Sequence, residues 1–284
     1  MKLGRTVVAA TCGMLAAAAL TSCGSSGEDG ENTSPAAGCT PAHPDVQTLR
    51  KGELNVLVYV TPPYTVKEGS TFGGVEGQIV EQIAKLECLQ LKEKAVSAAA
   101  GLASIEAGRA DIVVGGIYFT EDRAKVLGLS APMYRDGMAL LSKDGLDGTL
   151  DGLAGKTVGV IQGYLWNEDF QKALGSDKVK LYQDSASLLT DVKNGRVDAA
   201  VLTSAEAGYR AAQDSSLEVV AFQPSPQIAA SASQNEVVMA MPKEKTALIA
   251  VVDDDIKTLV GDGTVASALE ANGMDPSLAG PAAP

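Results

Sequence analysis

Histidine, aromatic residues and clusters of basic residues are all scarce in this chain of 284 residues. The sequence has one histidine, 4% aromatic residues, no run of Lys or Arg longer than two, and a net charge of −12. Binding to nucleic acid requires a basic face that neutralises phosphates, so nucleic acid is excluded as a partner. The histidine, His43, lies beside Pro44 in an amino-terminal arm, which excludes a His-dependent catalytic dyad or triad.

A long apolar run that could span a membrane is missing after residue 23. Residues 1–23 are predicted to be a secretion signal, because Lys2 and Arg5 precede an apolar run, 7–20, that is too short to favour a membrane-spanning helix. Removing this leader, which carries two basic residues and no acidic one, takes the net charge from −12 to −14. We interpret the acidity as solubility outside the cell.

The leader ends in Leu20-Thr21-Ser22-Cys23, which resembles the bacterial lipobox. The resemblance implies that Cys23 is diacylated and becomes the new amino terminus. The alternative is ordinary signal-peptidase cleavage beside a coincidental cysteine. Residues 24–45 are predicted to be a flexible linker, since most of that stretch is rich in Gly, Ser, Glu and Asn. We therefore expect a folded body tethered by lipid to the extracellular face of the cell membrane.

Cysteine is also infrequent, and its four positions divide into separate roles. Cys12 leaves with the leader and Cys23 takes the lipid, so Cys39 and Cys88 remain as a pair in an oxidising compartment. We predict a disulfide that closes a loop of about 50 residues and contributes about 4 kcal/mol. Two free thiols or a metal site are the alternatives. We expect no metal, because two sulfurs and one distant histidine do not complete a tetrahedral zinc shell.

A short motif occurs twice, 87 residues apart, as GRADIVV (108–114) and GRVDAAV (195–201). Each copy is predicted to end an amphipathic helix, with glycine as the stop signal, and to begin a buried strand. The apolar faces of these helices are Ala98, Leu102 and Ile105 in the first and Leu188, Leu189 and Val192 in the second. Two similar α/β units therefore lie in one chain, and 45% apolar content can fill two cores. A paired architecture leaves a cleft where small ligands are usually held.

The hydrophobic pattern also predicts where the lobes begin and end. Strands are expected at 54–60, 112–116, 138–142, 157–161, 217–222 and 237–241. Helices are expected at 75–86, up to 105, from 120, from 162, up to 192, at 205–213 and around 248–259. The first lobe is predicted to comprise 46–136 and 240–278, the second 137–239, and 279–284 a frayed tail. The chain thus crosses between the lobes twice, which makes a hinge.

Eight segments resemble, in their order and spacing, family 3 of the extracellular solute-binding proteins. They are GEL (52–54), PPY (62–64), GQIVE (77–81), AGRAD (107–111), TEDR (120–123), SAPMY (130–134), GKTVGV (155–160) and NGRVDA (194–199). The similarity covers about residues 50–274. It implies an α/β periplasmic-binding-protein type II fold, in which two lobes, each a mixed sheet flanked by helices, are joined by two hinge crossovers. It also implies a role beside ABC importers for polar amino acids and related amines.

The resemblance gives Arg123 the role of gripping a ligand's α-carboxylate, for which a planar guanidinium offers two parallel donors. Its position supports this role independently, because a cation in the first turn of the helix that Thr120 caps is electrostatically misplaced. The alternative is a salt bridge to Glu121 or Asp122, although neighbouring side chains seldom face one another on a helix.

Other matched positions depart from the family pattern. Gly115, Gly116 and Tyr118 stand where the family offers backbone or hydroxyl contacts to the ligand, and where serines are commoner. Thr203 stands where the family has the acid that binds the ligand's α-ammonium, and a neutral hydroxyl does not match a carboxylate's attraction for a buried cation. Glu206, one helical turn beyond Thr203, is either its substitute or a solvated helix residue.

Aromatic residues near predicted strand ends are a second candidate for holding an amine, through cation–π attraction. Tyr64, Tyr118, Tyr164 and Trp166 occupy such positions, and the alternative for each is simple packing. The residues that we expect to bind the ligand are Arg123, Tyr64, Gly116, Tyr118, Thr120, Gln162, Tyr164 and Thr203.

The sequence as a whole predicts a lipid-anchored solute-binding component of an ABC importer rather than an enzyme. It is expected to capture a small carboxylate-bearing polar solute, an amino acid or a related amine, by closing its lobes. The expected partners are the solute, the permease subunits and the membrane, with no cofactor and a monomeric chain. A ligand-sensing envelope protein and a dehydratase on the same fold are the alternatives. The identity of the solute stays open.

Overall fold

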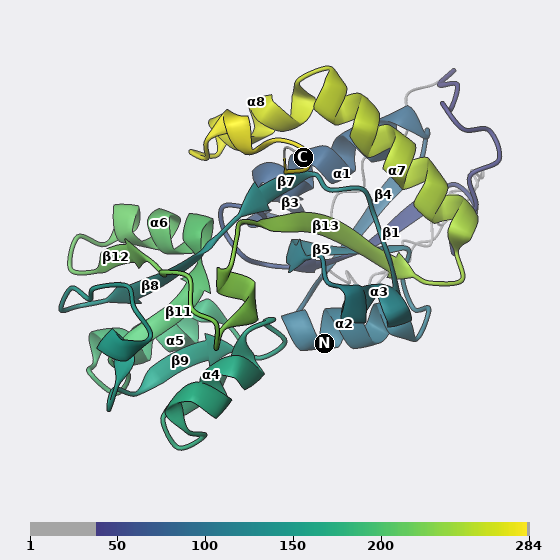
Figure 1. Ribbon diagram of the computed structural model, residues 1–284. Helices are drawn as coiled ribbons and strands as arrows, with labels where there is room; N and C mark the ends of the chain where they lie inside the picture. The colour runs from purple at the N-terminus through teal and green to yellow at the C-terminus, as the bar shows by residue number, and fades with distance from the viewer. Residues whose placement is uncertain (1–37, 283–284) are drawn as a thin grey trace, which may run out of the picture.

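The computed structural model describes residues 38–282 as two α/β lobes that meet along one side (Figure 1). The predicted secretion signal, the lipidation site at Cys23 and the start of the linker lie outside the described residues. This arrangement confirms the predicted two-lobed α/β fold, and both predicted crossings between the lobes are present.

The first lobe is built on a six-stranded sheet in the order β4-β1-β5-β13-β6, with β7 paired to β13. Its strands are β1 (Glu53–Tyr59), β4 (Gln90–Val96), β5 (Ile112–Tyr118), β6 (Leu127–Leu129), β7 (Tyr134–Asp136) and β13 (Asn235–Pro242). Strands β1, β4 and β5 are parallel, and β13 runs antiparallel to its neighbours. A small hairpin of β2 (Val66–Glu68) and β3 (Thr71–Gly73) follows β1.

Helices cover both faces of this sheet, so β1 is buried on both of its faces. Val56 and Val58 pack toward one cluster of helices, whereas Leu57 packs toward the opposite face. The first face carries α1 (Gly74–Leu86), α7 (Thr246–Gly261) and α8 (Thr264–Ala271), and the second carries α2 (Ala98–Glu106) (Figure 1). The short α3 (Glu121–Val126) follows β5, and a 3-10 turn η3 (Pro276–Leu278) ends the lobe.

The second lobe has a five-stranded sheet in the order β10-β9-β11-β8-β12. Its strands are β8 (Met138–Ser142), β9 (Val158–Ile161), β10 (Val179–Tyr182), β11 (Ala199–Thr203) and β12 (Glu218–Ala221). Its helices are α4 (Asn167–Leu174), α5 (Ser185–Lys193) and α6 (Ser204–Gln213), with 3-10 turns η1 (Asp151–Leu153) and η2 (Ala229–Ser231). In both sheets three parallel strands are followed by one antiparallel strand, so the two lobes repeat one design.

The repeated sequence motif has the same structural role in each lobe. Gly108 and Gly195 both adopt the left-handed conformation after a helix, with φ of 65° and 69°. Asp111 and Asp198 directly precede the next strand, and each accepts a hydrogen bond from a backbone amide in or beside the neighbouring strand, at 2.9 Å and 2.6 Å. The motif therefore sets the register of the central parallel strands in each lobe.

Three boundaries differ from the prediction. Residues 279 and 280 are not part of a frayed tail, because Ala279 forms a β-bridge with Tyr134 and the Gly280 amide donates to the carbonyl of Met133 at 2.8 Å. Strand β13 pairs with the first sheet from Asn235 onward, so the return crossing lies before residue 235 rather than between 239 and 240. Helix α4 begins at Asn167, not at Gln162, because Gly163 (φ 94°) and the turn closed by the Tyr164 amide on the Ile161 carbonyl precede it. This turn projects into the space between the lobes.

The amino-terminal arm is fixed to the first lobe. Cys39 and Cys88 form the predicted disulfide. The arm also donates backbone hydrogen bonds from Ala42 to the carbonyl of Leu86 (2.9 Å) and from Leu49 to the carboxylate of Asp111 (2.5 Å). Part of the segment predicted as flexible linker, from Gly38 to Asp45, is therefore held against the body.

Candidate functional site

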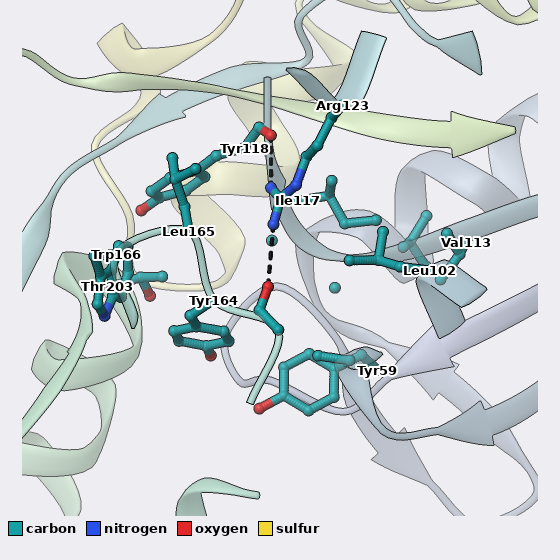
Figure 2. A pocket seen from close by; sticks show the side chains of 15 residues that line it. Tyr59, Leu102, Val113, Ile117, Tyr118, Arg123, Tyr164, Leu165, Trp166 and Thr203 are labelled. Atoms are coloured by element: carbon teal, nitrogen blue, oxygen red, sulfur yellow. Dashed lines mark hydrogen bonds between the residues drawn. The ribbon is translucent and has the colours of Figure 1, made fainter. Parts of the chain in front are cut away.

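A pocket lies between the lobes at the ends of their parallel strands. The first lobe lines it with β1, α2, β5 and α3, and the second lobe lines it with the turn between β9 and α4 and with the end of β11 (Figure 2). Among the described residues that line the pocket, Arg123 alone carries a charge. The pocket is therefore suited to a small ligand with a negative group.

Arg123 reaches from the first lobe to the second. Its Nη1 donates to the carbonyl of Tyr118 in its own lobe at 2.7 Å, and its Nη2 donates to the carbonyl of Gly163 across the pocket at 3.1 Å (Figure 2). Burial lowers the pKa of Arg123 from its ordinary value, with no carboxylate nearby to oppose that change. The guanidinium forms no ion pair within residues 38–282, so the alternative salt bridge to Glu121 or Asp122 is not formed.

Thr120 holds the backbone from which Arg123 projects. Its Oγ1 accepts a hydrogen bond from the Arg123 amide at 3.0 Å and so caps α3, as predicted. Thr120 does not line the pocket, however. Thr120 thus positions Arg123, the expected ligand contact, and does not itself face the pocket.

Aromatic rings form one wall of the pocket. Tyr164 lies edge-on to Tyr59 (6.2 Å between ring centroids) and to Trp166 (5.1 Å), and Trp166 lies 6.0 Å from Tyr118. Burial raises the pKa of Tyr118 and Tyr164 well above the usual value, so their hydroxyls stay protonated. Tyr59 was not among the expected ligand contacts. Its place at the end of a predicted buried strand is the feature of the sequence that could have identified Tyr59 as a pocket residue.

The backbone N–H groups of the glycines in β5 are less available to a ligand than the family pattern suggests. The amides of Gly115 and Gly116 donate to the two carboxylate oxygens of Glu76, at 2.7 Å and 2.8 Å. Glu76 is fully buried at the start of α1. Gly116 lines the pocket, but its N–H group is already engaged by the protein.

Two further expected contacts lie elsewhere. Tyr64 does not line the pocket: it is fully buried, its ring packs on that of Tyr134, and its hydroxyl donates to Asp136. A Cβ at Gly116 would lie 2.8 Å from the Tyr64 ring, which shows how closely Tyr64 packs beneath β5. Gln162 is exposed and hydrogen-bonds Gln183, because the turn before α4 carries it away from the pocket.

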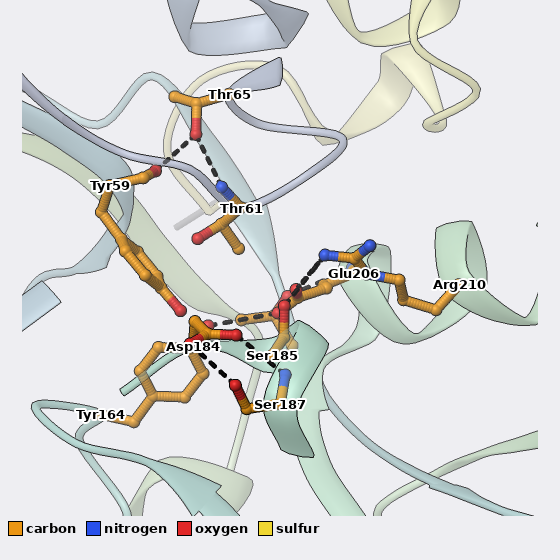
Figure 3. A network of polar contacts seen from close by, with 10 residues as sticks. Tyr59, Thr61, Thr65, Tyr164, Asp184, Ser185, Ser187, Glu206 and Arg210 are labelled. Atoms are coloured by element: carbon orange, nitrogen blue, oxygen red, sulfur yellow. Dashed lines mark hydrogen bonds and ion pairs between the residues drawn. The ribbon is translucent and has the colours of Figure 1, made fainter. Parts of the chain in front are cut away.

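Thr203 lies on the second-lobe side of the pocket (Figure 2), and Glu206 lies near Tyr164 in the same lobe (Figure 3). Thr203 lines the pocket and caps α6, accepting from the amide of Glu206 at 3.2 Å. Glu206 is fully buried, so the view of it as a solvated helix residue is wrong. Its carboxylate accepts from the Tyr164 hydroxyl (3.2 Å) and pairs with Arg210 (3.4 Å), while burial raises its pKa. Glu206 therefore lies behind Tyr164 and orients that ring.

Asp136 joins the lobes at the first crossing. It is 4% exposed and accepts hydrogen bonds from the hydroxyls of Tyr64 and Tyr118 in the first lobe and from the amide of Ala205 in the second. Burial raises its pKa to about 6. Because the native state holds this proton more tightly than the unfolded chain, the resulting stability is present at low pH and is lost as the pH rises through about 6.

Replacing Asp136 by Asn should remove this pH dependence. Between pH 4.5 and 7.5 the unfolding free energy of the unmodified protein is expected to fall by about 2 kcal/mol relative to that of Asp136→Asn. Urea titrations at both pH values measure the difference. Asp177→Asn, which changes an exposed acid in the turn between α4 and β10, is the control. The prediction would be contradicted if the difference in unfolding free energy between the unmodified protein and Asp136→Asn were the same at both pH values.

Comparisons with known proteins agree with this architecture. The L-cystine-binding protein TcyJ of Escherichia coli (strain K12) is 26% identical over 208 residues, which cover 72% of this chain and 76% of that protein. A structure of an ancestral arginine-binding protein bound to glutamine has 25% identity and a TM-score of 0.70, over 79% of this chain and 99% of the other. An amino acid ABC transporter substrate-binding protein from Streptococcus pneumoniae, bound to L-arginine, has 24% identity and a TM-score of 0.70, over 78% and 94% of the two chains.

Within residues 38–282 no helix is both long enough and apolar enough to cross a membrane. The profile of one family matches residues 54–272, which is well over half of the chain and includes both lobes and the pocket. The chain therefore belongs to the bacterial extracellular solute-binding proteins, family 3.

Proposed function

We propose that this protein is the solute-binding component of an ABC importer and that it captures a small carboxylate-bearing polar solute, an amino acid or a related amine. The observation that carries the proposal is the state of Arg123, a half-buried guanidinium at the pocket whose hydrogen-bond acceptors are two neutral carbonyls rather than an acid. A carboxylate that entered the pocket would supply the missing negative charge through charge-assisted hydrogen bonds. The protein is thus prepared for an acid from solution.

The aromatic wall favours an amine on the same solute. None of the described residues that line the pocket is acidic, so an ammonium group has no direct carboxylate partner there. Faces of Tyr and Trp rings attract cations that lie within about 6 Å of the ring centre. Tyr59, Tyr118, Tyr164 and Trp166 provide such faces, and the Glu206 carboxylate behind Tyr164 adds a favourable charge.

Capture is proposed to occur by lobe closure. The guanidinium of Arg123 and the ring of Tyr164 already bridge the two lobes in this structure. A ligand that contacts both lobes stabilises the closed form by as much as its affinity for that form exceeds its affinity for the open one. The two crossings, at Gly137 and before β13, are the places where the backbone would turn.

The site of action is proposed from the sequence and the family. The lipobox at Cys23 supports a lipid anchor on the extracellular face of the cell membrane, and membership of an extracellular binding family supports that location. The permease subunits of an importer are the proposed protein partners, and we expect a monomer. Family members are binding proteins, which agrees with the prediction that this chain is not an enzyme.

A thermal-shift screen tests the proposed ligand class. The purified protein is screened against amino acids, betaines, ectoines and polyamines, and each carboxylate is paired with its neutral amide. At 100 times Kd, a ligand that binds only the native state raises the melting temperature by about 5–10 °C. We expect this shift for at least one acid and its loss for the matching amide. Stabilisation only by compounds without a carboxylate would contradict the role of Arg123.

Signalling through a partner is the alternative function, since the same binding event can serve a sensor. Permease and ATPase genes beside this gene would favour import, and a sensor kinase gene would favour signalling. A transport assay in cells that lack the gene separates the two, because only an importer component is needed for uptake of the solute.

A further inference from the structure

A second cluster of polar side chains lies outside the pocket, where the amino-terminal arm meets the end of α1 and the middle of α7. His43 of the arm lies between Glu87, which follows α1, and Asp255 of α7. The Nδ1 atom of His43 is 2.7 Å from Oε1 of Glu87 and 3.8 Å from Oδ1 of Asp255. One oxygen or nitrogen from each of the three residues lies within 4.8 Å of the others.

Both acids of this cluster are buried, but they are compensated unequally: Glu87 accepts from the backbone amide of His43 at 3.1 Å and faces the Nδ1 atom of its ring at 2.7 Å. Glu87 and Asp255 are each 2% exposed, and neither forms an ion pair with Lys or Arg in the described part of the chain. Oδ2 of Asp255 is buried and has no hydrogen-bond partner within residues 38–282. A buried carboxylate oxygen without a donor is costly, and buried charges are normally paired or bound to a metal. One histidine does not satisfy both acids.

We propose that His43, Glu87 and Asp255 bind a divalent cation of the zinc type. Zinc takes nitrogen and oxygen ligands at about 2.0–2.2 Å in a tetrahedral arrangement, so neighbouring ligand atoms lie about 3.4 Å apart. The observed separations of 2.7 Å and 3.8 Å lie on either side of that value. Small side-chain rotations would therefore complete three of the four ligand positions and leave the fourth for water. His43, whose side chain is 31% exposed, provides the opening to solvent.

A third acid supports the use of the Nδ1 atom of His43 as the metal ligand. Oδ2 of Asp254 lies 3.3 Å from Nε2 of His43, on the other side of the ring. Histidines that bind metals usually donate their second N–H to a carboxylate, which fixes the ring and strengthens the bond to the metal. Asp254 is largely exposed and does not reach the cluster's interior, so it is a positioning residue.

The bound cation would join the arm to the first lobe beside the disulfide, because Cys88 directly follows Glu87. None of these residues lines the pocket between the lobes. The inference is therefore independent of the solute and of the proposed function. Its expected effect is greater stability of the junction between the arm, α1 and α7.

Zinc titration tests the site directly. The full chain, purified in detergent and freed of metal with EDTA, is titrated with ZnCl₂ by calorimetry and by thermal shift. We expect one equivalent to bind and to raise the melting temperature by about 5 °C or more at saturating zinc. Since His43 is the sole histidine of the chain, binding through other histidines cannot contribute.

Variants assign the binding to these residues. His43→Ala and Asp255→Asn should each weaken zinc binding at least tenfold, and Asp254→Asn should weaken it about tenfold while leaving the three ligands in place. Glu270→Gln, an exposed acid on α8, is the matched control and should bind like the unmodified protein. If a buried variant fails to fold without metal, the exposed Asp254→Asn decides. Absence of stoichiometric binding, or binding unchanged in all three variants, would overturn the proposal.

Discussion

Replacing Arg123 by Met is expected to lower the affinity for the solute by about 100-fold, which corresponds to about 3 kcal/mol. The substitution keeps much of the side-chain length and removes every donor. A carboxylate in the pocket then loses its charged partner while it remains largely desolvated. Isothermal titration calorimetry with a solute from the thermal-shift screen measures the change.

Arg123→Lys sharpens this test. Lysine keeps the positive charge but not the planar pair of donors, so a loss of about tenfold is expected if the carboxylate is held by two parallel hydrogen bonds. Arg196→Met is the matched control, because Arg196 is the second residue of the second copy of the repeated motif, is 66% exposed at its side chain and pairs with Asp191. If Arg123→Met and the unmodified protein bound the solute with equal affinity, Arg123 would not be a ligand-binding residue.

Removing the disulfide between Cys39 and Cys88 is expected to destabilise the protein by about 4 kcal/mol, the value for a loop of about 50 residues. The crosslink reduces the conformational entropy of the unfolded chain, and in the folded protein it holds the arm against the end of α1. The double variant Cys39→Ala/Cys88→Ala and reduced unmodified protein should unfold at the same lower urea concentration. Adding reductant to the double variant is the control and should change nothing. Unfolding of the unmodified protein that is insensitive to reductant would refute this expectation.

The architecture could be predicted largely because its central strands have buried, β-branched sequences. Strand β8 lies at the predicted residues 138–142, and the repeated motif identified the helix ends and strand starts of both lobes. Edge strands β4 and β10 were not predicted, since they carry lysines on exposed positions and lack a continuous apolar run. An edge strand is specified by the neighbour that it pairs with, which a local pattern does not reveal.

The sequence predicted that Arg123 lies at the site, and it predicted the residues around Arg123 less completely. Arg123, Gly116, Tyr118, Tyr164 and Thr203 were expected as contacts, and the structure brings all five to one pocket. Whether they bind the solute stays a prediction until the screen and the variants are measured. The family resemblance indicated Arg123, Gly116 and Thr203, and position near predicted strand ends indicated Tyr118 and Tyr164.

Side-chain direction accounts for the departures. Tyr64 points to Asp136, 72 residues away, and Glu206 accepts a hydrogen bond from Tyr164, 42 residues away. Such partners are set by tertiary packing. Local sequence shows that a tyrosine or an acid is near a strand end but not which way it faces.

The carboxylate of Glu76 has a consequence for how selectivity can change in this protein. By occupying the amides of Gly115 and Gly116, it leaves recognition under the proposed function to Arg123, the tyrosines and Trp166. Backbone N–H donors persist through any substitution except proline, whereas side chains are replaced one codon at a time. A receptor of this kind can exchange one nutrient for another through a few point changes, with the scaffold of both lobes left intact.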